Sequence, residues 1–162
     1  MLFRSVNKHK RHLYHEQSLL LAVFAYKKWD SEALFVGSNL VLTGLLVLLL
    51  KNIYQRPRPS ILHLVEEKGF SFPSGHSLAS TLVLGSLIII ISQHVKHKTA
   101  CYCLQGLLVL GIVTIVVSRV YVGVHYPSDV LGSMILGLAV LQFEYPLYDR
   151  LRFQWRFTGK QK

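Results

Sequence analysis

The sequence predicts an all-α fold, a bundle of helices that is integral to a membrane. Of the 162 residues, 51% are hydrophobic, and the mean hydropathy is +0.38. The apolar residues gather in four long blocks, and a membrane-spanning helix needs about 17–25 such residues. These blocks leave no polar face for water, which disfavours the alternative of a buried helical bundle in a soluble protein.

The four apolar blocks predict four transmembrane helices. They cover residues 33–50, 78–92, 101–117 and 130–148. The second block is short, but its helix can begin near His76 and run to Gln93. A further apolar run, residues 18–26, is too short to span a membrane alone. We expect it to form a short or truncated N-terminal helix.

The net charge of +10 follows the same pattern. Basic residues stand before the first block (Lys27, Lys28), between the second and third (Lys96, Lys98), and after the fourth. With four crossings these clusters share one side, which the positive-inside rule identifies as the cytoplasm. The basic excess is therefore a topology signal, and nucleic acid is not an expected partner.

This reading divides the chain into three parts. Residues 1–32 form a basic N-terminal segment with a partial apolar helix, and residues 33–148 form the membrane core. Residues 149–162 form a basic cytoplasmic tail.

The first of three polar motifs follows the first block, on the predicted extracytoplasmic side. Lys51 ends the block, and Arg58 stands between Pro57 and Pro59. The prolines stiffen the loop. A guanidinium fork suits phosphate oxygens, and a lysine adds a point charge beside it. The alternative for this motif alone, a positive cap at a helix end, carries equal weight.

The second motif, residues 71–77, precedes the second block. Gly75 allows a close approach of the backbone to a ligand. The free N–H groups of the helix start then offer an anion site. Ser74 can donate its hydroxyl, and His76 is placed to give a proton. The alternative is that His76 is a polar cap at the membrane interface.

The third motif lies between the third and fourth blocks. His125 and Asp129 are four residues apart, one helical turn, and Pro127 suits the first turn of the fourth helix. Asp129 is expected to accept a hydrogen bond from one imidazole nitrogen and to leave the other free as a nucleophile. Arg119 adds a phosphate donor. The alternative is a buried His–Asp pair that holds two helices together.

Together the motifs predict phosphoryl transfer through a covalent phosphohistidine. His125 attacks in line, His76 protonates the leaving oxygen, and Asp129 stabilises the imidazolium. No metal or cofactor is expected, because a two-metal phosphatase needs several carboxylates. On this side of the membrane the sequence offers only Glu66, Glu67 and Asp129.

The motif set resembles that of the type-2 phosphatidic acid phosphatase superfamily. That pattern is Lys, six residues, Arg-Pro; then Pro-Ser-Gly-His; then Ser-Arg, five residues, His, three residues, Asp. The sequence matches every position between Lys51 and Asp129. The resemblance implies metal-independent hydrolysis of lipid phosphates or diphosphates, with His125 as nucleophile and His76 as acid. The phosphate ligands it implies are Lys51, Arg58, Ser74, Gly75 and Arg119.

Undecaprenyl diphosphate is the first expected substrate, followed by phosphatidylglycerophosphate and phosphatidic acid. Bacterial membrane members of the superfamily usually have two spanning helices before the lysine motif, where this sequence has only the run at residues 18–26. The alternative function is a catalytically silent, truncated homologue that binds lipid headgroups or a protein partner. A channel or transporter is disfavoured, because its polar residues should recur in mid-membrane.

Overall fold

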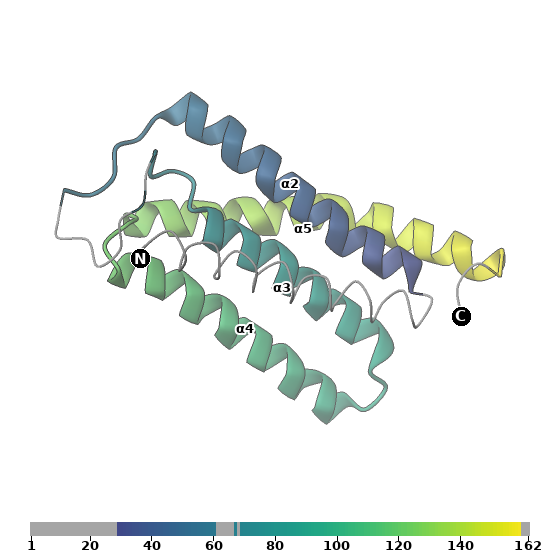
Figure 1. The fold of residues 1–162 in the computed structure, drawn as a ribbon. Helices are drawn as coiled ribbons and strands as arrows, with labels where there is room; N and C mark the ends of the chain where they lie inside the picture. Colours follow the sequence, from purple (N-terminus) through teal and green to yellow (C-terminus); the bar gives the residue numbers. More distant parts are fainter. Residues whose placement is uncertain (1–28, 61–66, 68, 160–162) are drawn as a thin grey trace, which may run out of the picture. The chain divides into compact units, whose positions relative to one another are not determined.

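The computed structural model describes residues 29–60, 67 and 69–159. These residues form four helices and no strand (Figure 1): α2 (Asp30–Tyr54), α3 (Gly75–His94), α4 (Lys98–Tyr121) and α5 (Pro127–Phe157). All four are long and apolar enough to cross a membrane. The predicted all-α fold with four spanning helices is confirmed. The apolar run at residues 18–26 lies outside the described residues.

The helix starts follow local signals in the sequence. Ser74 is the N-cap of α3, where its hydroxyl oxygen accepts the Ser77 N–H at 3.5 Å. The helix ends at His94, so its predicted extent is correct to within one residue at each end. α5 begins at Pro127, as the fixed φ of proline predicts.

The last helix is longer than the sequence suggested. α5 continues through Pro146 and past residue 148 to Phe157, so most of the predicted tail belongs to the same helix. Residues 149–157 contain no glycine or proline to interrupt it. The chain leaves the helical conformation only near Gly159, whose φ is +66°.

The chain separates into two compact units. The larger unit is Phe35–Leu147; of the other, the structure describes residues 29–34 and 148–159. In the larger unit α3 is the most buried helix, with α4 beside it (Figure 1). α3 also approaches α5 closely, because a Cβ on Gly137 would lie 2.8 Å from Cγ2 of Thr81.

Polar side chains link the helices inside the larger unit. The Asn39 amide of α2 donates to the Ser86 hydroxyl of α3 at 3.0 Å. The Gln105 amide of α4 donates to the Ile88 carbonyl of α3 at 3.1 Å. Such bonds hold helices together where the apolar surroundings supply no water.

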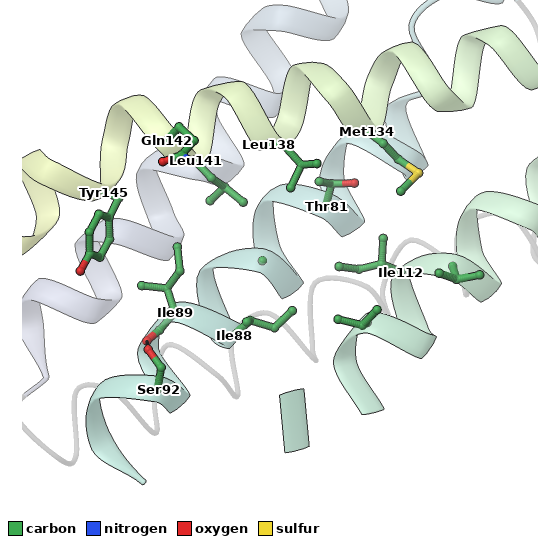
Figure 2. A pocket seen from close by; sticks show the side chains of 13 residues that line it. Thr81, Ile88, Ile89, Ser92, Ile112, Met134, Leu138, Leu141, Gln142 and Tyr145 are labelled. Atoms are coloured by element: carbon green, nitrogen blue, oxygen red, sulfur yellow. Dashed lines mark hydrogen bonds between the residues drawn. The ribbon is translucent and has the colours of Figure 1, made fainter. Parts of the chain in front are cut away.

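An apolar cavity of about 670 Å³ lies between α3, α4 and α5. Figure 2 shows Ile88, Ile112 and Leu138 around it. None of the predicted site residues lines this cavity. The candidate chemistry is therefore elsewhere in the larger unit, where the helices end.

Candidate active site

The fold brings the three motifs to one end of the larger unit. Lys51 lies in the last turn of α2, and Arg119 lies in the last turn of α4. Gly75 and His76 begin α3, with His76 exposed. Asp129 is in the first turn of α5. Successive helices run in opposite directions, so the ends that carry the motifs meet.

Hydrogen bonds connect the three motif segments to one another. Arg58 donates from Nη1 to the Val124 carbonyl at 2.9 Å and from Nε to the Gly69 carbonyl at 3.0 Å. The Ser74 N–H donates to the Ser133 hydroxyl at 2.9 Å. The first motif is thus attached to the third, and the second to α5.

The two arginines expected to bind phosphate face one carboxylate. Oε2 of Glu67 lies 3.0 Å from Nη1 of Arg58, and Oε1 of Glu67 lies 3.8 Å from Nη1 of Arg119. Arg58 and Glu67 both act electrostatically on the Lys51 ammonium. Cations from two helix ends and a loop therefore gather around a single anionic group, an arrangement that suits a phosphate.

In the second motif, the Ser74 side chain is engaged in helix capping, and Gly75 leaves the backbone uncovered. The buried hydroxyl oxygen of Ser74 accepts the Ser77 hydroxyl at 3.0 Å in addition to the capping N–H. A Cβ on Gly75 would lie 3.8 Å from Val47, an ordinary van der Waals distance. Contacts within the protein therefore do not require glycine at position 75. A ligand that approaches the backbone closely would explain the absence of a side chain.

The predicted hydrogen bond between His125 and Asp129 is not formed. Nδ1 of His125 lies 3.9 Å from Oδ2 of Asp129, which is beyond hydrogen-bonding distance. The Asp129 carboxylate instead accepts the Ser71 hydroxyl, the Tyr126 N–H at 3.1 Å, and Nη1 of Arg56 at 2.5 Å. These donors occupy the carboxylate, so the imidazole and the carboxylate are neighbours without a direct bond.

The electrostatics of His125 favour its neutral form. Burial lowers the pKa of His125 below its usual 6.5, and the Arg58 guanidinium lowers it further. The carboxylates of Glu67 and Asp129 act in the opposite direction. Nδ1 is buried and has no hydrogen-bond partner among the described residues. A neutral imidazole is the form that can act as a nucleophile.

Two residues of this site were not identified from the sequence. Arg56 stands two positions before Arg58 and is not part of the motif pattern, although a second cation next to two prolines was a usable signal. The role of Glu67 as the partner of two arginines had no local signal, because it depends on the fold. Within the described residues, no group of three or more His, Cys, Asp or Glu side chains could hold a metal ion.

Comparison with known proteins agrees with the motif pattern. Residues 32–153 match the model of the PAP2 superfamily. The chain is 38% identical over 123 residues to phosphatidylglycerophosphatase B of Bacillus subtilis (strain 168), covering 72% of this chain and 57% of that protein. It is 28% identical over 141 residues to undecaprenyl-diphosphatase BcrC of the same organism, covering 83% and 68% of the two chains.

A solved structure gives the same result. The crystal structure of a transmembrane PAP2 type phosphatidylglycerolphosphate phosphatase from Bacillus subtilis superposes with a TM-score of 0.67 at 29% identity. The likeness covers 90% of this chain and 77% of that one. The four apolar helices and this transmembrane neighbour establish an integral membrane protein. With three quarters of its length matched by the family model, the chain belongs to the PAP2 superfamily.

Proposed function

We propose that this protein hydrolyses a lipid phosphate or diphosphate without a metal ion, through a phosphohistidine on His125. One observation carries the proposal: Arg58 and Arg119, from separate motifs, converge on one carboxylate, and Arg58 is bonded to the backbone next to His125. The cluster is a preformed anion site beside a buried, neutral imidazole. Such preorganised donors stabilise a transferring phosphoryl group.

The proposed first step transfers the phosphoryl group to the protein. The substrate phosphate replaces the Glu67 carboxylate between Arg58 and Arg119, with Lys51 and the N–H groups at the start of α3 as further donors. The imidazole of His125 attacks phosphorus in line, and the bond from phosphorus to the lipid oxygen breaks. His76 gives its proton to that leaving oxygen.

The second step regenerates the enzyme. Water attacks the phosphohistidine, and the phosphorus–nitrogen bond breaks to release inorganic phosphate and neutral His125. His76, now deprotonated, accepts the proton from the water. Throughout, Asp129 stabilises the positive charge on the imidazole by its field, because the 3.9 Å separation keeps the two groups close without a hydrogen bond.

Two lipid substrates have support from the relatives. One relative is named a phosphatidylglycerophosphatase and another an undecaprenyl-diphosphatase. Undecaprenyl diphosphate was the first expectation from the sequence, but the higher identity is to the phosphatidylglycerophosphatase, so both are candidates. We propose that the site faces outside the cytoplasm and that the C-terminus lies inside it, in a bacterial cell membrane, and the distribution of basic residues supports this.

The test is phosphate release by the detergent-purified chain from each lipid, in the presence of EDTA. We expect EDTA-resistant release that is lost in His125→Ala and kept in His97→Ala, a control at an exposed histidine before α4. The ratio of the two rates identifies the preferred lipid. Absence of release from folded protein with either lipid contradicts the proposal and favours the catalytically silent homologue.

A further inference from the structure

Arg56 lies in the first motif segment and contacts the other two, although the motif pattern does not include it. Its carbonyl accepts the Ser71 N–H at 2.8 Å, which joins the first motif to the second. Its guanidinium carbon lies 4.3 Å from the centre of the Tyr126 ring, a cation–π contact with the third motif. Nη1 donates to the Ser128 hydroxyl at 2.9 Å and to Oδ1 of Asp129 at 2.5 Å.

The Asp129 carboxylate depends on this contact. Its side chain is fully buried, whereas the Arg56 side chain keeps 39% of its surface exposed. A buried carboxylate without a counter-charge is costly. Arg56 is the cation that pairs with Asp129 within the part of the chain that the structure describes.

The contact also sets the orientation of the carboxylate. Arg56 binds Oδ1, while the other oxygen, Oδ2, accepts the Tyr126 N–H and is the one that lies 3.9 Å from Nδ1 of His125. Rotation of the carboxylate would break these bonds together. The distance from Oδ2 to the imidazole therefore depends on Arg56 together with Ser71 and Tyr126, which also donate to this carboxylate.

We propose that Arg56 is a positioning residue, which supplies the counter-charge of the buried Asp129 carboxylate and holds Oδ2 towards His125. Its guanidinium is directed at Asp129, Ser128 and the Tyr126 ring. It differs in this from Arg58 and Arg119, which face Glu67 in the expected phosphate position. The kinetic part of the test rests on the proposed function, but the structural part does not.

The structural part is titration of His125 in detergent by nitrogen NMR of labelled histidine, with the signal assigned by its loss in His125→Gln. The charged groups that act on this imidazole are Arg58, Glu67 and Asp129. Arg56→Gln removes the cation that offsets Asp129, so the negative field at His125 grows. We expect the pKa of His125 to rise by about one unit.

The kinetic part compares Arg56→Gln with Arg58→Gln. A positioning residue acts on the chemical step, so Arg56→Gln should lower kcat about 10–100-fold while KM stays within about threefold. The acidic limb of its pH profile should move to higher pH with the titration of His125. Arg56→Lys keeps the charge, so its acidic limb should return to the wild-type pH. Its kcat should remain a few-fold below the wild-type value.

An unchanged His125 titration with unchanged kcat in folded Arg56→Gln would overturn the positioning role. A rise in KM like that of Arg58→Gln would also overturn it, because Arg56 would then be a phosphate ligand. If Arg56→Gln does not fold, Arg56→Lys and Tyr126→Leu carry the test, and unchanged kcat in both overturns the role. If the wild-type chain releases no phosphate but the titration shifts, the proposed function fails and the positioning role stands.

Discussion

Two fully buried carboxylates, each beside an arginine, have very different surroundings. Asp129, in the larger unit, pairs with Arg56 at 2.5 Å and lies next to His125, whose Nδ1 is buried without a hydrogen-bond partner among the described residues. Glu32, in the other unit, pairs with Arg152 at 3.6 Å.

Glu32 also contacts two hydroxyl groups. It accepts the Ser31 hydroxyl at 2.9 Å and the Tyr148 hydroxyl at 3.4 Å. Glu32 therefore joins the start of α2 to the end of α5. A buried ion pair alone does not indicate catalysis. What distinguishes Asp129 is the neighbouring imidazole, beside the arginines that we propose bind phosphate.

The largest expected difference in turnover is between two variants, each of which neutralises one of these carboxylates. Asp129→Asn should lower kcat about 10²–10³-fold, because an amide cannot stabilise an imidazolium and Arg56 loses its counter-charge. Glu32→Gln should leave turnover per folded molecule within about twofold and lower the melting temperature instead. Phosphate release and thermal unfolding in detergent measure both. If both folded variants lost turnover equally, the account that assigns Asp129 to the site and Glu32 to structure would be contradicted.

A smaller effect is expected from Arg58→Gln. A charge-assisted hydrogen bond is worth about 1.5–3 kcal/mol, so kcat/KM should fall about 10–100-fold, mainly through KM. Arg58 lowers the pKa of His125, so its loss raises that pKa. Protonated imidazole cannot attack, and the acidic limb of the pH profile should therefore move to higher pH.

The control for Arg58→Gln is Lys96→Gln, an exposed cation between α3 and α4. It changes the net charge by the same amount far along the helices from the motifs, and we expect no shift of the limb. A limb that moves equally in both variants would mean that the overall charge, and not Arg58, sets the His125 titration.

Glu67→Gln should act in the opposite direction and more weakly. The carboxylate of Glu67 occupies Arg58 and Arg119 in the substrate-free protein, so its neutralisation should lower KM a few-fold. Glu67 raises the pKa of His125, so the acidic limb should move to lower pH. Initial rates over a pH series measure both effects. A higher KM would show that Glu67 assists binding.

The smallest effect on turnover is expected from a change in packing. Gly137→Ala would place a methyl group 2.8 Å from Thr81, and the resulting overpacking should cost about 1–3 kcal/mol of stability. Gly106→Ala in α4 is the matched control, because nothing lies within 4 Å of the added atom. Thermal unfolding should separate the two, while both keep the wild-type pH profile. A shifted limb in Gly137→Ala would contradict a purely structural role.

The sequence was most informative where local signals decide the structure. The apolar blocks and Pro127 at a helix start located the helices, because hydropathy and the fixed φ of proline are local properties of the sequence. The sequence located the end of the fourth apolar block but not the end of α5, because Pro146 and the polar residues after it do not stop a helix that is already formed.

The site showed the same division between local and long-range information. Motif spacing indicated that the cations would meet, since all three motifs lie at helix ends. It could not show that Asp129 is bound by Arg56, 73 positions away in the sequence, and not by His125. It also could not show that Glu67 lies between Arg58 and Arg119. Both contacts depend on how the loops pack once the helices have assembled.

The central claim is that His125 becomes covalently phosphorylated, and rapid-quench mass spectrometry of the purified chain tests it most directly. The chain is mixed with lipid phosphate in EDTA, quenched in alkali within one turnover, and digested for mapping. We predict a phosphoryl group on His125 that is stable in alkali, labile in acid, and absent from His125→Ala. Phosphate release by the wild-type chain with no label on His125 at any time would contradict the account.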